Sequence, residues 1–502
     1  MATSLMVMGT ASDVGKSVIV TGLCRLCARA GLRVAPFKSQ NMSNNAAVCR
    51  GAGEIGRAQA VQAEACGLEA SVDMNPVLLK PESETGCQVV IGGRPRFRMS
   101  THDDNHYYER AWPAIVESYQ RLSAQFDAII IEGAGGAAEV NLRDRDVANW
   151  RVAELANAPV LIVADIDKGG ALAALVGTVH LLSPMERARV KGLIINKFRG
   201  DTALLKDGLR IIEENTGAPI LGVVPYANGL DIPLEDSASL VSGTKSADSG
   251  LIQVGVVLLP RISNHTDFEA LAREPDVELR YIERPAQIGH LDLLCLPGSK
   301  STIADLLWLR ECGWDRAIAA HYKSGGSILG ICGGYQMLGR RIADPRHLES
   351  SIAEAEGLGM LAIKTVFDEK ITALVRAREY LSNLEVSGYE IHCGRVSRLE
   401  EKAAFQIRER DGLSVDESEG VLSGDGRVLG TAIHGLLDEP GFRRRYLDRI
   451  RARKGLKPLD VSGVGDARGM RMRAYDRFAD MLAKNLDIAA LAKMTGFNLP
   501  NA

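Results

Sequence analysis

The sequence lacks the features that would place a protein in a membrane, outside the cell or on nucleic acid. No apolar run approaches the roughly 18 residues that a membrane-spanning helix needs, and the N-terminus has no charged segment followed by an apolar one. The formal net charge is only -3 over 502 residues, which gives no basic surface for a polyanion. The nine cysteines are odd in number and scattered, which is typical of reduced thiols. We expect a cytoplasmic protein that binds neither membrane nor nucleic acid.

What is present is the composition of a globular protein, with 46% hydrophobic and 25% charged residues. A chain of this length exceeds a single core, so two or three domains are expected. Residues 236–250 are small and polar, and we interpret them as a linker between a first domain over 1–235 and a second over 251–445. For residues 446–502 we predict helices that pack on the second domain. The sequence is compatible with an oligomer.

A glycine-rich segment near the N-terminus has the pattern of a phosphate-binding loop. Residues 9–17 read Gly-Thr-Ala-Ser-Asp-Val-Gly-Lys-Ser between an apolar run and a helical pattern. In such a unit backbone N–H groups turn toward phosphate oxygens, Lys16 reaches the outer phosphates, and the Ser17 hydroxyl can bind Mg²⁺. Five residues rather than four separate Gly9 from Gly15, a spacing that resembles the dethiobiotin synthetase-like branch of P-loop proteins, whose members make acyl phosphates. We therefore predict ATP binding at Gly15, Lys16 and Ser17.

Polar residues follow several apolar runs of the first domain, where the strands of a sheet would end. The runs are continuously apolar, as strands covered by helices on both faces require, so we predict a doubly wound parallel sheet in an α/β domain. Open sheets of this kind bind ligands at the carboxyl edge of their strands. There we expect Glu132 to hold Mg²⁺ and Asn196 to contact a purine. Lys38, Asn41 and Asp165 are predicted to surround a substrate carboxylate.

Cys332 lies between glycines where an apolar run passes into a helix-compatible segment. Gly-x-Cys-x-Gly is the strand-turn-helix pattern of a nucleophile elbow with Cys in place of Ser. The N-terminus of the next helix favours a thiolate, and the backbone N–H groups of Gly298 and Gly333 are candidates for an oxyanion hole. His434 follows a later apolar run and could meet Cys332 at a strand end. A cysteine–histidine pair of this kind attacks amides or esters.

A thiol nucleophile and a P-loop on one chain are chemically complementary, because ammonia released from glutamine can be captured by a carboxylate that ATP has phosphorylated. Over essentially its whole length the chain resembles the glutamine-dependent cobyric acid synthases of cobalamin biosynthesis. The resemblance rests on residues 9–17, 38–43, 75–81, 132–135, 165–170, 196–201, 260–264, 388–392 and 433–435. It implies a C-terminal class I glutamine amidotransferase α/β domain and the use of ATP, Mg²⁺ and L-glutamine. The implied reaction amidates the b, d, e and g carboxylates of adenosylcobyrinic acid a,c-diamide, a small-molecule corrinoid.

The resemblance carries over Cys332 and His434 and leaves the third member of the catalytic triad open. Class I glutaminase domains usually carry His-x-Glu. Here Gly435 and Leu436 follow His434, and the nearest acid is Asp438.

Three alternatives fit parts of the sequence. A sibling amidase that acts on the a and c carboxylates of cobyrinic acid shares both domain types, and the polar residues 40–45 and the segment 196–201 favour the first assignment over it. A ParA-like regulatory ATPase needs only the P-loop domain and leaves Cys332 and His434 without a role. A pure binding module would need a degenerate elbow, whereas the glycines and the histidine are intact.

Overall fold

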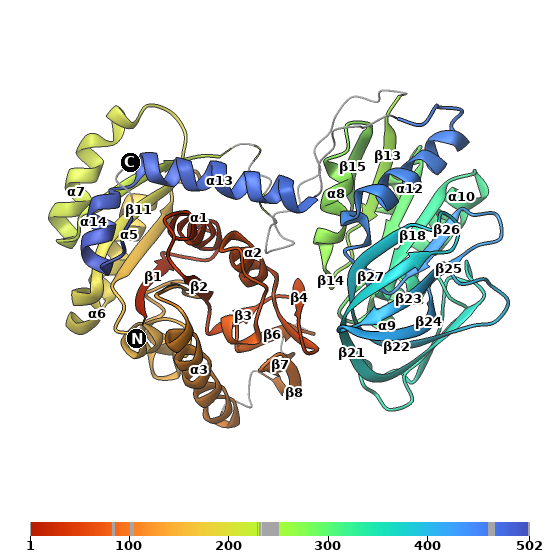
Figure 1. Cartoon of the computed structure of the whole chain (residues 1–502), viewed down its shortest axis with the longest axis horizontal. Helices are drawn as coiled ribbons and strands as arrows, with labels where there is room; N and C mark the ends of the chain where they lie inside the picture. The colour runs from red at the N-terminus through yellow and green to blue at the C-terminus, as the bar shows by residue number, and fades with distance from the viewer. Residues whose placement is uncertain are drawn as a thin grey trace.

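In the computed structural model of the chain two α/β domains lie side by side, and a long helix from the C-terminal part of the chain returns to the first domain (Figure 1). The structure describes residues 2–82, 86–100, 105–227, 229, 232, 250–459 and 467–499. Within those ranges no helix has the length and apolar character needed to cross a membrane. Of the predicted linker, residues 236–250, all but Gly250 lie outside the described part of the chain.

A parallel six-stranded sheet forms the centre of the first domain, which confirms the predicted doubly wound fold. In sheet order the strands are β12 (Ile220–Pro225), β11 (Val190–Phe198), β10 (Val160–Asp165), β1 (Thr3–Gly9), β9 (Ala128–Glu132) and β2 (Val34–Phe37). Successive side chains of a strand point to opposite faces. In β1, Leu5 and Val7 accordingly enter one apolar core, and Met6 and Met8 enter the other.

Helices cover both faces of this sheet. On the face of Met6 lie α3 (Asn105–Gln125), α4 (Trp150–Leu155), α5 (Ala171–Leu181) and α7 (Lys206–Thr216), and α6 (Pro184–Arg189) leads into β11. On the face of Leu5 lie α1 (Lys16–Arg29), α2 (Arg57–Ala65), α13 (Ala467–Asn485) and α14 (Ile488–Thr495). The strand ends of the sheet, where ligands are expected, are thus left open between the helix layers.

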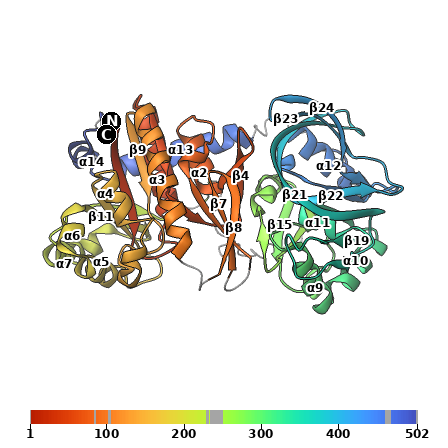
Figure 2. The same ribbon diagram turned by 90° about the horizontal axis from the view of Figure 1, so that it is seen from below.

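Short strands between α1 and α3 extend the first domain toward the second (Figure 2). They form the sheet β3 (Gln40–Met42), β6 (Val77–Pro81), β7 (Gly86–Ile91) and β8 (Arg94–Ser100), and the hairpin β4 (Ala46–Cys49) and β5 (Gly53–Gly56). The polar residues 40–42 form β3, because they pair in parallel with β6. Side chains of β4, β6 and β7 share a small apolar cluster with Tyr389 and Ile391 of the second domain.

The second domain contains two large sheets and one short strand pair. The first has the order β15 (Val277–Ile282), β13 (Ile252–Val257), β16 (Leu293–Leu296), β18 (Ser327–Ile331), β26 (Val428–Thr431) and β25 (Val421–Leu422), parallel except for β25. It is flanked by α8 (Glu269–Ala272), α9 (Thr302–Glu311), α10 (Trp314–Lys323), α11 (Gly333–Met337) and α12 (Pro440–Arg453). This arrangement confirms the predicted α/β fold of the second domain.

The second sheet is built on two long antiparallel strands, β21 (Ile363–Glu379) and β22 (Glu385–Arg398). Its other strands are β19 (Arg341–Ala343), β20 (Glu354–Glu356), β23 (Phe405–Arg410), β24 (Leu413–Glu419) and β27 (Ile433–His434). Because β27 pairs with β22, it brings His434 opposite Tyr389. A short pair, β14 (Ile262–Ser263) and β17 (Gly298–Ser299), lies beside this junction.

The C-terminal helices correct the prediction for residues 446–502. α12 packs on the second domain, and the predicted domain end falls within it. α13 and α14 pack on the first domain instead, with α13 along α1 (Figure 1). A Cβ at Gly22 of α1 would lie 2.5 Å from Leu482 Cδ1, and Arg25 pairs with Asp476 at 2.7 Å. Helical spacing indicates an apolar face without indicating which domain covers it, so the prediction was wrong for these two helices.

Candidate functional site

The turn between β18 and α11 holds Cys332 in a strained backbone conformation, with φ 52° and ψ -110°. A non-glycine residue adopts such angles only where its surroundings enforce them. The enforcement is visible at Gly334, where an added Cβ would lie 2.0 Å from the carbonyl oxygen of Leu296. The elbow therefore has the strand-turn-helix form that its glycines predict, and the Cys332 side chain is fixed at its apex.

His434 lies beside Cys332 and is held by Asp267 at one edge and by the Tyr389 ring on one face. Its Nδ1 is 2.7 Å from Asp267 Oδ2, and the backbone N–H of Gly435 donates to Asp267 Oδ1 at 2.8 Å. The Tyr389 ring stacks on the imidazole with centroids 5.2 Å apart. With Nδ1 occupied by the carboxylate, Nε2 is the nitrogen left to exchange a proton with Cys332.

The charge state of His434 follows from these neighbours. Burial alone would lower its pKa, but the Asp267 carboxylate and the Cys332 side chain outweigh burial and raise the pKa to about 10. A raised pKa means that the imidazolium contributes to folded-state stability fully below pH 6.5, and that this contribution is lost as the pH rises through about 10. An imidazolium next to a sulfur is the resting arrangement of an activated cysteine nucleophile.

The two glycines predicted for an oxyanion hole lie close to this pair, Gly298 beside His434 and Gly333 directly after Cys332. A Cβ at Gly298 would be 3.3 Å from His434 Cε1, and one at Gly333 would be 2.8 Å from the backbone nitrogen of Ser299. The strand β17 therefore passes directly over the start of α11. The Gly334 N–H is taken by the Pro297 carbonyl at 3.0 Å. The placement of Gly298 and Gly333 is compatible with the predicted role.

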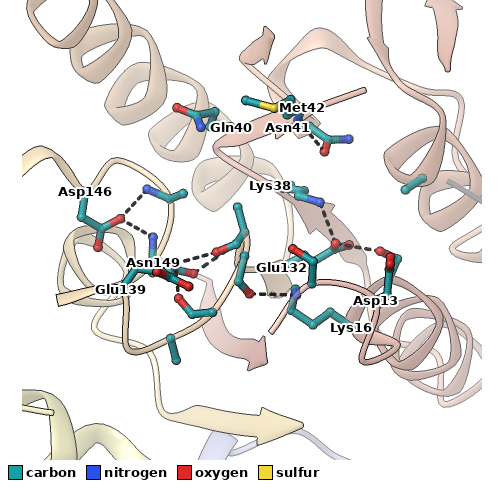
Figure 3. A pocket seen from close by; sticks show the side chains of 18 of the residues that line it. Asp13, Lys16, Lys38, Gln40, Asn41, Met42, Glu132, Glu139, Asp146 and Asn149 are labelled. Atoms are coloured by element: carbon teal, nitrogen blue, oxygen red, sulfur yellow. Dashed lines mark hydrogen bonds and ion pairs between the residues drawn. The ribbon is translucent and has the colours of Figure 1, made fainter. Parts of the chain in front are cut away.

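The first domain contains a cavity of about 990 Å³ at the carboxyl edge of its central sheet. Figure 3 shows Glu132 at its floor, with Lys16 and Lys38 close by and the segment 40–42 along one side. Lys16 Nζ donates to the carbonyl oxygens of Ala11 and Gly135 at 2.8 and 2.9 Å. This holds the P-loop lysine across the mouth of the loop, where phosphates would replace the carbonyl contacts.

Glu132 is the centre of the cavity floor. Its Oε1 accepts from Ser17 Oγ and from Lys38 Nζ, each at 2.8 Å, and its Oε2 accepts from Gln62 Nε2 at 2.6 Å. Burial raises the pKa of this carboxyl, but the Lys38 charge and the hydrogen bonds outweigh burial and hold the pKa below its ordinary value. Glu132 is therefore a charged carboxylate, only 1% exposed, that faces the P-loop hydroxyl.

Of the predicted ligand residues, Gly15, Lys16, Ser17, Lys38, Asn41 and Glu132 line the cavity. Asn196 and Asp165 lie behind the phosphate loop. Asn196 Nδ2 donates to the Val14 carbonyl at 2.9 Å, so the side chain supports the loop from β11. Asp165 pairs with Lys197 at 2.7 Å, and Lys197 also donates to the Asp13 carbonyl. Neither Asn196, predicted to contact a purine, nor Asp165, predicted to contact a substrate carboxylate, is among the residues that line the cavity.

Both domains match known families. Residues 5–239 match the CobQ/CobB/MinD/ParA nucleotide binding domain, and residues 253–442 match the CobB/CobQ-like glutamine amidotransferase domain. The cobyric acid synthase of Moorella thermoacetica is 46% identical over 100% of this chain and 98% of its own. That of Sorangium cellulosum is 48% identical, and that of Syntrophobacter fumaroxidans 44%, each over 99% of both chains. The chain belongs to the cobyric acid synthase family.

As a member of the cobyric acid synthase family, the protein is a glutamine-dependent ligase whose two domains bind a nucleotide and glutamine. Asp267 is the residue of the glutaminase site that the sequence did not single out. It lies in the 3₁₀ turn His265–Phe268, just after β14. Asp438, the nearest acid in sequence, instead pairs with Arg471 of α13 at 3.2 Å. No motif or spacing in the sequence marks Asp267, which lies ten residues beyond the end of β13, the first strand of the domain.

Proposed function

We propose that this enzyme uses ATP and glutamine to amidate the b, d, e and g side-chain carboxylates of adenosylcobyrinic acid a,c-diamide, giving adenosylcobyric acid. The observation that carries the proposal is the character of the cavity in the first domain. Its floor is the charged cluster around Glu132, whereas its rim exposes Met42, Val140 and Leu142, with 57%, 42% and 51% of each residue accessible. A substrate that carries a carboxylate on a large apolar ring would place the carboxylate near the charged floor and the ring against the apolar rim.

Ammonia comes from glutamine at the second domain. The Cys332 sulfur attacks the carboxamide carbon, and His434 gives its Nε2 proton to the departing ammonia, which leaves a thioester on Cys332. Water then hydrolyses the thioester to glutamate, with His434 as the base. Developing negative charge on the carbonyl oxygen would be stabilised by backbone N–H groups at Gly298 and Gly333.

Amide formation takes place at the first domain. The substrate carboxylate attacks the terminal phosphorus of ATP, which gives an acyl phosphate and ADP. Ammonia then displaces phosphate to form the amide. Lys16 and Lys38 supply the positive charge that balances the phosphoryl oxygens during transfer, and the N–H groups of the P-loop orient them.

Magnesium fits the same floor. Mg²⁺ in nucleotide sites takes one or two protein oxygens and otherwise phosphates and water. Ser17 Oγ lies 2.8 Å from Glu132 Oε1. The carboxylate would supply a charged oxygen ligand and the hydroxyl a neutral one. When bound, the ion would neutralise charge between the phosphates. Within the described residues no group of three His, Cys, Asp or Glu forms a separate metal cluster, so this pair is the donor set on which the proposal rests.

The apolar rim also accounts for how one site could treat several carboxylates. The side chains of a rigid macrocycle point in different directions, so a fitted pocket would accept one of them. A rim of three apolar residues would hold the ring by one face and leave it free to dissociate and rebind in a new orientation. Partly amidated corrinoids should therefore appear free in solution during a time course. A pulse of labelled substrate that passes undiluted to the final product would contradict this.

The deciding experiment is mass spectrometry of the corrinoid products formed with ATP, Mg²⁺ and glutamine. Each amidation replaces an acid OH by NH₂, so the number of steps is read directly. Four additions to the a,c-diamide are expected. Two additions to cobyrinic acid, with no reaction of the a,c-diamide, would instead identify the sibling amidase.

A further inference from the structure

One side chain of the first domain reaches the glutaminase site of the second. Arg57, the first residue of α2, donates through Nη2 to the Tyr389 hydroxyl and to the Ala46 carbonyl, the latter at 3.1 Å. Its guanidinium carbon lies 5.2 Å from the centroid of the Tyr389 ring. Asn264 Nδ2 donates to the same hydroxyl at 3.0 Å. The Tyr389 hydroxyl is therefore fixed by one donor from each domain.

Tyr389 in turn packs against His434, the proposed catalytic base. Its ring stacks on His434 with an interplanar angle of 15°. Asp267 fixes the imidazole at one edge, which still allows the ring to tilt about that contact. The stacked tyrosine removes this freedom, so the direction of Nε2 toward Cys332 depends on where Tyr389 is held.

The helix that carries Arg57 also reaches the cavity of the first domain. Gln59 accepts from Asn41 Nδ2 at 2.9 Å, and Gln62 donates to Glu132 at 2.6 Å. Arg57 and Gln62 are five residues apart in one helix, which corresponds to about 8 Å of rigid length at 1.5 Å per residue. A ligand that displaced Glu132 or Asn41 would therefore act on α2 at a short distance from Arg57.

We propose that Arg57 is a positioning residue for the glutaminase base, supplied by the first domain through Tyr389. We also infer that α2 makes glutamine hydrolysis depend on whether the cavity around Glu132 is filled. The inference rests on the proposed function, since it takes that cavity to be the site of ATP and the carboxylate. The residue touches neither glutamine nor the reacting atoms; it acts on the orientation of His434.

The experiment compares four single variants of the full chain and the double variant Arg57→Met/Tyr389→Phe. Arg57→Met removes the interdomain donor, Arg57→Lys restores a shorter donor, and Tyr389→Phe keeps the ring but loses the hydroxyl. Arg98→Met is the matched control, because Arg98 also crosses the interface, to the Leu348 carbonyl, and lies on the remote strand β8. Glutamate release is measured as a function of glutamine, with and without ATP, Mg²⁺ and the corrinoid. Ammonia-driven amidation is measured in parallel.

Arg57→Met should lower kcat for glutamate release about tenfold, which is the effect of about 1.4 kcal/mol on a barrier. KM for glutamine should change less than twofold, because ring orientation affects chemistry rather than binding. Filling the cavity should raise glutamate release in the wild type and not in Arg57→Met. Arg57→Lys should recover part of both effects. Tyr389→Phe should resemble Arg57→Met, and the double variant should be no worse than Tyr389→Phe, since both act through one contact.

Three results would overturn the inference. The first is an Arg57→Met variant with wild-type kcat and wild-type stimulation, and the second is additive losses in the double variant. The third is an equal loss of kcat in Arg98→Met, which would mean that any weakening of the domain interface lowers glutamate release. If glutamate release by the wild type is the same with and without ATP, Mg²⁺ and the corrinoid, α2 does not couple the two sites. Failure of the proposed function has a separate signature, which is the absence of amidated corrinoid from the wild type with either nitrogen source.

Discussion

Replacing Asp267 by Asn tests the charge that keeps His434 protonated. The imidazole has a pKa of about 10 instead of 6.5, and the difference corresponds to about 5 kcal/mol at 1.36 kcal/mol per pKa unit. Asp267 and Cys332 share this effect. If Asp267 supplies about half, its loss costs about 2.5 kcal/mol, or roughly seventyfold in the equilibrium constant for protonation of His434. An asparagine amide that donates to Nδ1 would also place the ring proton on Nε2, in the tautomer that cannot accept from Cys332.

The assay is glutamate release by Asp267→Asn between pH 6 and 10, with amidation from ammonium salts as the folding control. A group with a raised pKa keeps its proton until the pH passes the folded value, so the wild type should lose the pair only near pH 10. In the variant, the high-pH decline of glutamate release should move toward neutral pH, and kcat should fall at least roughly thirtyfold. Asp438→Asn is the matched control, because Asp438 pairs with Arg471 instead. An unchanged high-pH decline with near-normal kcat in Asp267→Asn would refute the assignment of Asp267.

Other substitutions separate the two sites and test the elbow. Cys332→Ala should abolish glutamine-driven amidation and retain ammonia-driven amidation, and joint loss of both would contradict a division of labour. Lys16→Ala should reduce amidation from either source about a thousandfold or more while glutamate release stays measurable. Glu132→Gln should raise the Mg²⁺ concentration needed for half-maximal amidation, and normal activity at low Mg²⁺ would exclude it as a metal ligand. Gly334→Ala should cost about 3 kcal/mol in unfolding free energy by overpacking, whereas Gly424→Ala, with open space around it, should cost little.

The sequence was most informative where structure is local. The P-loop and the cysteine elbow are each formed by one continuous segment, so spacing and glycine content were sufficient to place Lys16 and Cys332 at strand-helix turns. The ends of apolar strands likewise predicted Glu132 at the edge of the sheet. All three depend on contacts within a few residues or on the topology of a parallel sheet.

The remaining site residues depend on long-range packing. Asp267 meets His434 across 167 residues of chain, and nothing in the spacing of either distinguishes Asp267 from other acids. Asp165 is the last residue of β10, at the sheet edge where ligands were expected. Its side chain pairs with Lys197 instead of facing the cavity. The destination of α13 depends on its complementarity to α1. Side-chain direction and domain choice of this kind are set by partners that periodicity does not identify.

The domain interface restricts how the two sites can communicate. Glu54 of β5 is fully buried between Lys80 of its own domain and Lys370 of the second. Burial raises the pKa of Glu54, but the two lysines outweigh burial and lower it to about 2, so the carboxylate stays charged at neutral pH. Separating the domains would have to break the Lys370–Glu54 ion pair, which the closed interface keeps out of water. Wide opening between turnovers is therefore disfavoured, and communication between the sites has to rely on small displacements of elements that touch both, of which α2 with Arg57 is one.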